Sequence, residues 1–396
     1  MQVGVVGLGY VGLSIAIASA KAGHQVAGFD TNARILAGLS SGKSHIEGIT
    51  DQDISQAISA GAEFVGDISR LNGAEIIVIA VPTPLGVDRK PDLSLLTSAA
   101  KSVASIARPG TLIVNESTSY PGTLRNLIAP IVGADKLYAA APERIDPGNE
   151  KWRINNTPRL VGGMSEAATK LAADYYGTIC GKVEIVSSPE VAETAKLFEN
   201  TFRQVNIALV NELAQICAGL DIPTNEVLDA AATKPFGFMK FLPSLGVGGH
   251  CIPVDPSYLS FIAKEAGLST RFIDIANAVN LEMPAYVVKR LADEFGALEG
   301  KKIQIAGISY KPDISDTRES PAVELLHLLR EARAEVSWHD PLVGNWNGEQ
   351  SAPLGKVDIA IIAAPHQVID FAPWQSGDLR VIDVSTSQQL RWEKFL

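Results

Sequence analysis

Short apolar runs alternate with helical patterns of apolar residues through the first half of the chain, from residue 1 to about 190. Five runs have the length and composition of buried strands, namely VGVVGL (3–8), QVAGFD (25–30), EIIVIAVP (75–82), TLIVNES (111–117) and KLYAAAP (136–142). Helical spacing lies between them, for example over 12–22 and 94–107. Strands that alternate with helices in this way predict βαβ units and a parallel sheet.

The pattern changes at residue 191. Over 191–219, apolar residues recur at steps of three and four, which predicts one long amphipathic helix with a buried apolar stripe. The stripe consists of Ala195, Phe198, Phe202, Val205, Leu209, Leu213 and Ile216. A second helix is predicted over 270–295, and a loop rich in Pro, Gly and Phe lies between the two helices at 233–256.

Strand–helix alternation returns from Lys301 onward. We expect strands in KIQIAGI (302–308), EVSWHD, VDIAIIAA and LRVIDVS, and a helix from Pro321 to Arg333. The sequence therefore predicts an α/β protein with two Rossmann-like doubly wound domains, joined by a central helical region with one long helix. We place the domains at 1–190, 191–296 and 297–396, and we expect ligands to bind in the cleft between the outer two.

Composition narrows the class of protein. The 396 residues are 46% hydrophobic and 20% charged, which is typical of a globular chain with two or three domains. The net charge of −10 argues against broad nucleic-acid binding. No run approaches the roughly 18 apolar residues of a membrane span, and the apolar opening is broken by glycines and lacks a basic leader. We therefore expect a cytoplasmic protein that binds neither a membrane nor nucleic acid.

The cysteines and histidines do not indicate a metal site. Cys180, Cys217 and Cys251 are too few and too scattered for a disulfide framework or a zinc site. The six histidines lack the spacing of metal ligands. We therefore expect no metal ion.

Gly7-Leu8-Gly9-Tyr10-Val11-Gly12 follows the first predicted strand and opens a helix. In a dinucleotide-binding turn, the first glycine permits the tight turn, the second lets the backbone approach a pyrophosphate, and the third packs the helix against the strand. Asp30 ends the second strand, where a carboxylate hydrogen-bonds a ribose diol and repels a 2′-phosphate, so NAD is favoured over NADP. The alternative is a tight turn that binds nothing. Arg34 either faces the adenosine or is a solvated helix residue.

The stretch Gly249-His250-Cys251-Ile252-Pro253-Val254-Asp255-Pro256 carries the most chemical information in the chain. A glycine-rich, proline-flanked loop is poor core material, and such loops usually position functional groups. We therefore predict that Cys251 is a nucleophile. The alternative is a small buried hydrophobe, which fits Cys217 and Cys180 better. Asp255 takes part in the chemistry, caps the following helix, or does both.

Lys196, Asn200 and Arg203 fall on one face of the predicted long helix. They either aim two cations and an amide at an oxyanion and a substrate, or they form a solvated face. Glu116-Ser117-Thr118 and Glu143 follow two strands of the first domain, at the edge where parallel sheets bind ligands. Thr118 has the alternative of capping the next helix.

Lys311 and Arg318 lie in the segment SYKPDISDTRESP, after the first strand of the last domain. Two cations at this place suit phosphate recognition. The alternative is a surface cluster of ion pairs with Asp313, Asp316 and Glu319.

Seven motifs now stand in order: GLGYVGL, PTPL…PDLS, ESTSYPGT, APERIDPGN, KLFENTFR, GGHCIPVDP and SYKPDISDTRESP. With them the chain resembles the nucleotide-sugar 6-dehydrogenases of the UDP-glucose/GDP-mannose dehydrogenase family over nearly its whole length. ESTSYPGT, PERxDPGN and KPFGFM…GGHCIPVDP are most similar to the branch that acts on UDP-N-acetylhexosamines (GlcNAc or ManNAc). UDP-glucose enzymes typically carry a serine where His250 stands.

The resemblance implies an NAD-dependent, four-electron oxidation of a sugar's primary alcohol to a uronic acid, in a homodimer built by the long helix. It implies that Cys251 forms a thiohemiacetal and then a thioester, while Lys196 and Asn200 stabilise oxyanion-like states. It also implies that Glu143 activates a water molecule, which is positioned with Thr118 and Asp255. The implied cofactor-binding positions are Gly7, Gly9, Tyr10, Val11, Gly12, Asp30, Arg34, Pro82, Thr83, Ser117, Thr118, Lys311 and Arg318. The implied substrate-binding positions are Glu143, Arg144, Ile145, Lys196, Asn200, Arg203, Phe238, Phe241, Gly248, Gly249, His250 and Lys311.

Two departures from the family pattern leave the epimer and the base open. Pro243-Ser244-Leu245-Gly246 stands where relatives often read PGPG, and the last predicted strand, VIDVSTSQQL, lacks their Asp-Thr-Arg-Asn ending. UDP-glucose is the alternative substrate. Two further functions stay open: a two-electron hydroxyacid dehydrogenase, which leaves Cys251 unused, and a sensor that binds NAD without turnover.

Overall fold

The computed structural model describes residues 1–145, 151–375, 379–387, 392 and 394–396. Its contacts divide the chain into two compact units. The first unit comprises Met1–Glu199 with Ser257–Gly267, and the second comprises Asn200–Pro256 with Leu268–Leu396. Each unit is described by itself.

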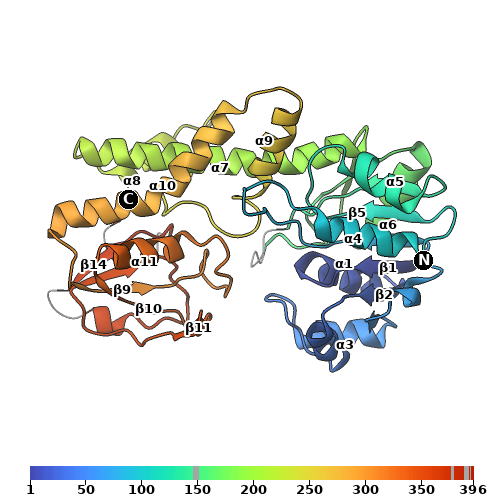
Figure 1. The fold of residues 1–396 in the computed structure, drawn as a ribbon, viewed down its shortest axis with the longest axis horizontal. Coiled ribbons are helices and arrows are strands. Elements are labelled where there is room, and N and C mark those ends of the chain that lie inside the picture. Colours follow the sequence, from blue (N-terminus) through green and yellow to red (C-terminus); the bar gives the residue numbers. More distant parts are fainter. Residues whose placement is uncertain (146–150, 376–378, 388–391, 393) are drawn as a thin grey trace. The chain divides into compact units, whose positions relative to one another are not determined.

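The first unit is built on an eight-stranded sheet with the order β3-β2-β1-β4-β5-β6-β7-β8 (Figure 1). All neighbouring strands are parallel except β6 and β7, which are antiparallel. From β1 the chain adds strands first on one side (β2, β3) and then on the other (β4, β5). The switch point, where such sheets bind ligands, therefore lies between β1 and β4. The strands are β1 (Gln2–Val6), β2 (Gln25–Phe29), β3 (Glu63–Val65), β4 (Ile76–Ile79), β5 (Leu112–Asn115), β6 (Leu137–Ala140), β7 (Arg159–Gly163) and β8 (Val183–Ile185).

Helices cover both faces of this sheet, because successive strand residues point to opposite sides. On one face Val3, Val5 and Val78 pack with α1, α3 and α6, and on the other Val6 and Ile79 pack with α4, η2 and α5. The central strands are therefore apolar on both sides, as parallel strands between two helical layers require. The helices are α1 (Tyr10–Lys21), α2 (Ala33–Ser40), α3 (Asp51–Ser59), η1 (Ile68–Leu71), α4 (Ser94–Ala104), η2 (Leu124–Ile128), α5 (Ala129–Val132) and α6 (Glu166–Ile179).

The second unit contains a four-stranded parallel sheet with the order β10-β9-β13-β14. One face packs against α10 and α11, and the other carries a smaller cluster that includes Trp374. The elements are α8 (Thr224–Ala232), α10 (Arg271–Phe295), β9 (Lys302–Ala306), α11 (Pro321–Glu331), β10 (Glu335–His339), β11 (Asn345–Trp346), β12 (Glu349–Gln350), β13 (Ile359–Ile362), η3 (Ala372–Trp374) and β14 (Arg380–Asp383). The predicted class, α/β with Rossmann-like sheets and a long central helix, is confirmed.

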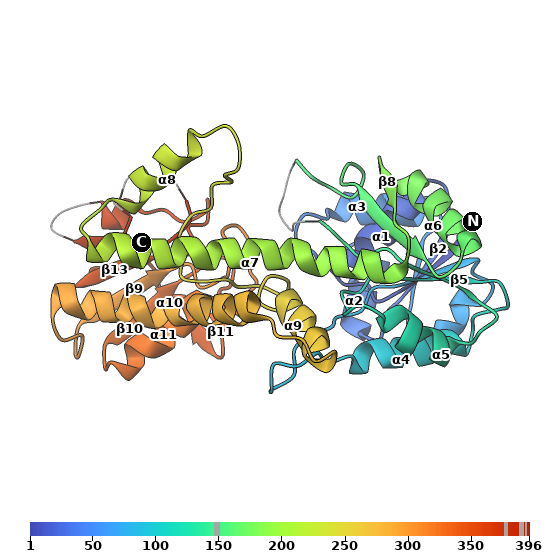
Figure 2. The same cartoon turned by 90° about the horizontal axis from the view of Figure 1, so that it is seen from above.

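Two helices have residues in both units, α7 (Pro189–Gly219) and α9 (Asp255–Glu265). From Asn200 onward α7 runs beside α10 (Figure 2). Amide side chains join these two helices: Asn211 Nδ2 donates to Asn280 Oδ1 at 3.0 Å, and Asn280 Nδ2 donates to the Gln204 carbonyl at 3.2 Å. Among the described residues, none of the helices is both long and apolar enough to cross a membrane.

The predicted buried stripe of α7 is wrong. Phe198, Leu209 and Ile216 are more than half exposed, and Phe202 is 41% exposed. The buried face of the helix instead holds Gln204, Ala208, Asn211, Ala214 and Cys217. Amides and small residues let α7 and α10 approach closely and bond across their contact, so hydrophobicity alone selects the wrong face. Of the predicted stripe, Phe198, Phe202, Leu209 and Ile216 are exposed, whereas Ala195, Val205 and Leu213 are half-buried.

Candidate functional site

The turn between β1 and α1 has the geometry of a phosphate-binding loop. Gly7 has a φ of +93°, and a Cβ there would lie 2.4 Å from the Ala80 carbonyl oxygen. A Cβ on Gly12 would lie 1.9 Å from the Gly7 carbonyl oxygen, so only glycine lets the helix come this close to the strand. A Cβ on Gly9, by contrast, would meet no other heavy atom within 4 Å. There is therefore room beside the start of α1 for an anion, which the helix dipole favours.

Asp30 lies directly beside this turn. Its Oδ2 accepts the Leu8 N–H at 2.8 Å, and its Oδ1 accepts the Asn32 N–H at 2.8 Å. A carboxylate accepts about four hydrogen bonds, so capacity for a ribose diol is left. Arg34 is exposed in the first turn of α2, where its backbone N–H bonds to Asn32. The turn and Asp30 thus fit a dinucleotide, and Tyr10 and Val11 open the helix that follows.

The loop after β4 is held by side chains from other elements. The Ser117 hydroxyl accepts the Val81 N–H at 2.9 Å, which fixes the chain just before Pro82 and Thr83. The Tyr258 hydroxyl donates to the Thr83 carbonyl at 3.0 Å. Pro82 is exposed, Thr83 is buried and Thr118 is half-buried. Ser117 and Tyr258 thus fix a loop that was predicted to contact the cofactor.

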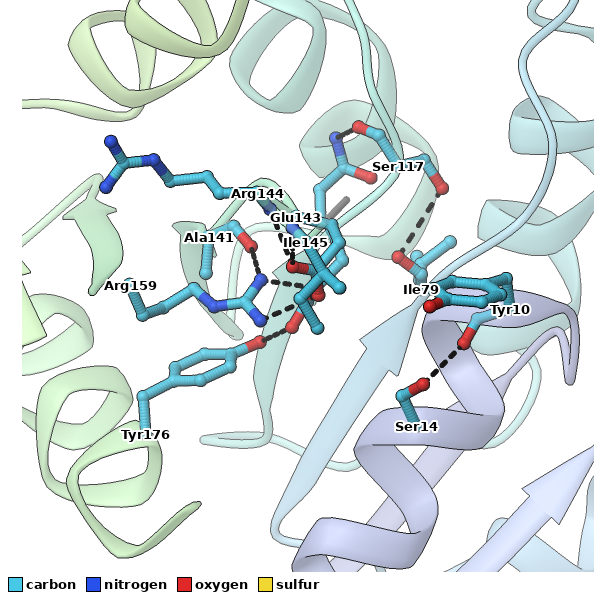
Figure 3. A network of polar contacts seen from close by, with 12 residues as sticks. Tyr10, Ser14, Ile79, Ser117, Ala141, Glu143, Arg144, Ile145, Arg159 and Tyr176 are labelled. Carbon is cyan, nitrogen blue, oxygen red and sulfur yellow. Dashed lines mark hydrogen bonds and ion pairs between the residues drawn. The ribbon is translucent and has the colours of Figure 1, made fainter. Parts of the chain in front are cut away.

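Three charged side chains meet at the ends of β5, β6 and β7 (Figure 3). Arg159 Nη1 donates to Glu116 Oε2 at 2.8 Å, and Arg159 Nη2 donates to Glu143 Oε2 at 2.7 Å. Glu116, Glu143 and Arg159 are 1%, 6% and 2% exposed. Tyr176 of α6 donates its hydroxyl hydrogen to Glu116. We call these four residues the Arg159 cluster.

The two carboxyls of the Arg159 cluster differ in protonation. Burial raises the pKa of Glu116 to about 7, although the charge of Arg159 opposes this and the charge of Glu143 adds to it. Burial also acts on Glu143, but Arg159 and the N–H groups of Arg144 and Ile145 outweigh it and lower its pKa. Those N–H groups donate to Glu143 Oε1 at 2.6 and 2.8 Å. Near neutral pH Glu143 is therefore a carboxylate and Glu116 titrates.

The Arg144 side chain points away from this carboxylate (Figure 3). It forms an ion pair with Glu199 at 2.7 Å and donates to the Pro158 carbonyl at 2.9 Å. Lys196, one turn earlier on α7, is buried. The remainder of the predicted motif, residues 146–149, lies outside the described residues.

Cys180 and Cys217 are buried, as predicted, whereas Cys251 is exposed. Four residues later Asp255 begins α9 and is buried, and its Oδ2 accepts the Asn200 amide at 2.5 Å. The Asp255 N–H donates to the Cys251 carbonyl at 2.8 Å. The second unit thus brings together three of the six predicted catalytic residues, and the first unit holds Lys196, Glu143 and Thr118.

The thiol loop rests on the segment that follows β9. The Gly249 N–H donates to the Arg318 carbonyl at 3.0 Å, and a Cβ on Gly248 would lie 2.6 Å from the Tyr310 Cβ. Arg318 is ion-paired with Asp316 at 2.5 Å. The hydrogen bond that Arg318 donates to Asp316 is the largest cause that raises the pKa of Arg318, and the charge of Cys251 contributes as well.

Arg318 therefore lies within electrostatic reach of the thiol. Burial, followed by the charge of Arg318, lowers the pKa of His250. His250 is accordingly neutral at pH 7. Lys311 is half-buried in the same segment.

The other predicted substrate residues of the second unit lie nearer to solvent. Arg203 and Phe238 are exposed. Phe241 packs edge-on against Phe202 of α7, with 5.9 Å between ring centroids. Within the described residues, no group of three or more His, Cys, Asp or Glu side chains is arranged to hold a metal ion.

The four-stranded sheet of the second unit also has an aspartate after a strand that neighbours its first strand, but this aspartate is buried. Asp340 follows β10 as Asp30 follows β2, and its Oδ2 accepts the Ile308 N–H at 2.9 Å. Asp340 is fully buried, and the same oxygen accepts a hydrogen bond from His366 at 2.9 Å. This carboxylate is closed off from a ribose, so the dinucleotide geometry is confined to the first unit among the described residues.

Sequence reasoning missed several residues that support the site. Arg159 is the first residue of the buried strand β7. A fully buried arginine is normally paired with an acidic side chain, so the sequence could have indicated such a partner. Glu193 is buried in α7, and its carboxyl oxygens accept the Gly122 N–H at 2.7 Å and the Leu124 N–H at 3.1 Å. Burial raises the pKa of Glu193 to about 7. Glu193 thus fixes the segment that follows Thr118.

Three sequence profiles of one family match the chain in succession. They are the NAD binding domain over residues 1–180, the central domain over 190–282 and the UDP binding domain over 304–384 of the UDP-glucose/GDP-mannose dehydrogenase family. The chain belongs to this family. It is therefore an NAD-dependent nucleotide-sugar 6-dehydrogenase, and the hydroxyacid dehydrogenase and sensor alternatives are set aside.

Individual relatives cover most of the chain. A UDP-N-acetyl-D-mannosamine dehydrogenase from Pyrococcus horikoshii is 36% identical over 95% of this chain and 92% of its own length. The structure of the P. horikoshii UDP-D-ManNAc dehydrogenase superposes with a TM-score of 0.87, covering 97% of this chain and 95% of that one. A UDP-N-acetyl-D-glucosamine 6-dehydrogenase from Pseudomonas aeruginosa is 34% identical over 87% of this chain and 83% of its own length. A UDP-glucose dehydrogenase structure from Pyrobaculum islandicum has a TM-score of 0.87 at 28% identity, covering 97% of this chain and 94% of that one.

Proposed function

We propose that this enzyme oxidises the primary alcohol of a UDP-N-acetylhexosamine, UDP-GlcNAc or UDP-ManNAc, to the uronic acid through a thioester on Cys251. The observation that carries the proposal is the exposed Cys251 thiol in a loop that leads directly to Asp255, whose carboxylate is held by Asn200. A buried core cysteine would not have this setting. The names of the relatives from P. horikoshii and P. aeruginosa support the substrate class.

Bound NAD+ supplies the hydride acceptor in each of two oxidations. The turn Gly7–Gly12 and Asp30 would hold its pyrophosphate and ribose. The residues that would line its other side are Pro82, Thr83, Ser117 and Thr118. In the first oxidation the alcohol carbon would give a hydride to NAD+ and the hydroxyl would give its proton to solvent, which leaves an aldehyde. Lys196 and Asn200 stabilise the negative charge that develops on the sugar oxygen.

The Cys251 thiolate then adds to the aldehyde carbon and forms a thiohemiacetal. Loss of the second hydride from that carbon gives a thioester. Water adds to the thioester carbonyl, its proton passes to Glu143, and the Cys251 thiolate leaves as the acid forms. Thr118 and Asp255 position this water. Because the half-oxidised sugar stays bonded to the enzyme, no free aldehyde is released.

Cations and loop residues of the described chain suit the nucleotide portion of the substrate. We propose that Arg203, Lys311 and Arg318 contact phosphates, and that Phe238, Phe241 and residues 248–250 enclose the nucleotide. Arg144 and Ile145 would act beside the sugar by holding the Glu143 carboxylate with their N–H groups. Within this scheme 1–190 binds NAD, 191–296 carries the thiol loop and the dimer contact, and 297–396 binds the UDP moiety.

The exposed apolar stripe of α7 supports a homodimer. Phe202, Leu209 and Ile216 recur along one side of a helix whose opposite side is already packed. An apolar surface of this kind typically marks a protein–protein interface. We propose that a second copy of the chain covers it.

The test is a panel of nucleotide sugars assayed for NADH and for acid. We expect two NADH per uronic acid, with the highest kcat/KM for UDP-GlcNAc or UDP-ManNAc. Cys251→Ala should abolish acid formation and leave NAD binding intact, whereas Cys217→Ala, a buried cysteine on α7, serves as the matched control and should keep activity. One NADH per turnover with aldehyde released would reject the mechanism. A preference for UDP-glucose, which the Pyrobaculum relative makes the alternative, would reject the substrate.

A further inference from the structure

The Arg159 cluster places one cation between two carboxylates in the interior of the first unit. Besides Glu116, Glu143, Arg159 and Tyr176, the titratable groups that act on it are Tyr175 and Cys180, both at the α6 side. Burial raises the pKa of Tyr175, Tyr176 and Cys180, so all three are neutral near pH 7. The charge of the cluster is therefore set by its two carboxyls and Arg159.

Glu143 is held by three donors. Its Oε1 accepts two backbone N–H groups and its Oε2 accepts Arg159, which uses three of the about four lone-pair directions of a carboxylate. The remaining direction is available to a water molecule. Arg159 thus fixes the orientation of the group proposed to activate water.

Glu116 shares the same guanidinium through its other terminal nitrogen. With Glu116 ionised, the cluster carries one negative charge, and a proton taken up by Glu143 makes it neutral. With Glu116 protonated, the cluster is already neutral, and a proton on Glu143 would leave Arg159 as an uncompensated buried cation. Because an unpaired buried charge is strongly unfavourable, Glu143 is the better base when Glu116 is ionised.

We propose that Arg159 is a positioning residue for Glu143, and that Glu116 controls hydrolysis of the thioester by setting how readily Glu143 accepts a proton. The inference rests on the proposed role of Glu143. This role can be measured separately in the hydrolysis of the thioester, because Cys251 is acylated in that step and does not titrate. A like charge nearby disfavours the ionised form of a carboxyl, and an opposite charge beside a carboxyl shifts its pKa by about one to three units. We expect acid release to rise with pH through the titration of Glu116, about tenfold in all.

The experiment is a rapid-quench measurement of acid release by the holoenzyme from pH 5.5 to 9, divided by the first NADH burst of the same sample. Glu116→Gln fixes the neutral state, because its amide oxygen still accepts from Arg159 while its amide hydrogens reach the Tyr176 oxygen. We expect release to become independent of pH and about tenfold slower at pH 8.5 than in the wild type. Glu166→Gln removes an exposed carboxyl of α6 and controls for the loss of one charge.

A second variant keeps the test decisive if Glu116→Gln does not fold. Tyr176→Phe removes the hydroxyl that stabilises ionised Glu116, so the midpoint of the release profile should move to higher pH. If the rate of acid release in either variant depends on pH as it does in the wild type, the inference is overturned and the cluster has only a structural role. Glu143→Gln separates the two levels: wild-type release in this variant would overturn the role of Glu143 itself, whereas a loss of about 10²–10⁴ supports it.

Discussion

Glu116→Gln makes a prediction about stability that does not depend on catalysis. The pKa of Glu116 is about 7 in the folded protein, because burial disfavours its charge, against an ordinary value of 4.5. Between these two values the folded state holds a proton that the unfolded state has lost. The carboxyl therefore favours folding at low pH, and this contribution disappears as the pH rises through the window from 4.5 to 7.

The magnitude follows from the size of the shift. At about 1.4 kcal/mol per pKa unit, linkage gives a loss of about 2.5 kcal/mol between pH 5 and pH 8 in the wild type. Glutamine does not titrate, so the variant lacks this loss. Glu193, whose pKa is also raised to about 7, titrates in both proteins and cancels in the difference between them.

The assay is pulsed hydrogen exchange in increasing urea, read by mass spectrometry on peptides that contain β5 and β7. These peptides report the unfolding of the first unit alone, which avoids a two-state treatment of the whole chain. The stability of the wild type minus that of Glu116→Gln should fall by about 2.5 kcal/mol from pH 5 to pH 8. A difference that stays constant or rises over this range would refute the reasoning that burial, and not the charge of Arg159, dominates at Glu116.

Three further predictions address the cluster, the turn and the helix stripe. Arg159→Met leaves two buried carboxylates without their cation and should destabilise the first unit by about 3–5 kcal/mol, seen in urea unfolding; an unchanged midpoint would contradict this. Gly12→Ala places a Cβ 1.9 Å from the Gly7 carbonyl oxygen, so calorimetry should show weaker NAD binding and a lower melting temperature, and wild-type affinity would count against the turn. Leu209→Glu should weaken the proposed homodimer roughly tenfold or more in light scattering, whereas Glu212→Gln, at an exposed position of the same helix, should not; a dimer that tolerates Leu209→Glu would use another surface.

The fold was largely predictable because periodicity reports burial where cores are apolar. β4 and β5 lie within the apolar runs that predicted them, and β1 begins one residue before its run. The helices α7 and α10 lie within two residues of the expected bounds. The same logic failed on the faces of α7. Gln204 and Asn211 are buried because they hydrogen-bond to residues of α10 or to the loop that starts at Ser244. Burial of this kind depends on a partner distant in sequence, which a hydrophobicity pattern cannot contain.

The candidate site divides in the same way. Gly7, Gly12 and Asp30 are linked by local geometry, and their arrangement was predictable from spacing. The thiol loop was recognisable because glycines and prolines around Cys251 exclude a core role. Arg159 was not predictable as a partner of Glu116 and Glu143, because the antiparallel pairing of β6 with β7 brings it there. The protonation of Glu116 follows only from that three-dimensional contact.

The most direct test of the account is to trap the sulfur intermediate. Glu143→Gln enzyme, mixed with NAD+ and the preferred UDP-sugar and quenched in acid, should carry the oxidised sugar nucleotide on the peptide that contains Cys251. Hydroxylamine should release it, as expected of a thioester, and the adduct should be absent from Cys217. Acid formation in the wild type without any adduct on Cys251 in this variant would contradict the central claim.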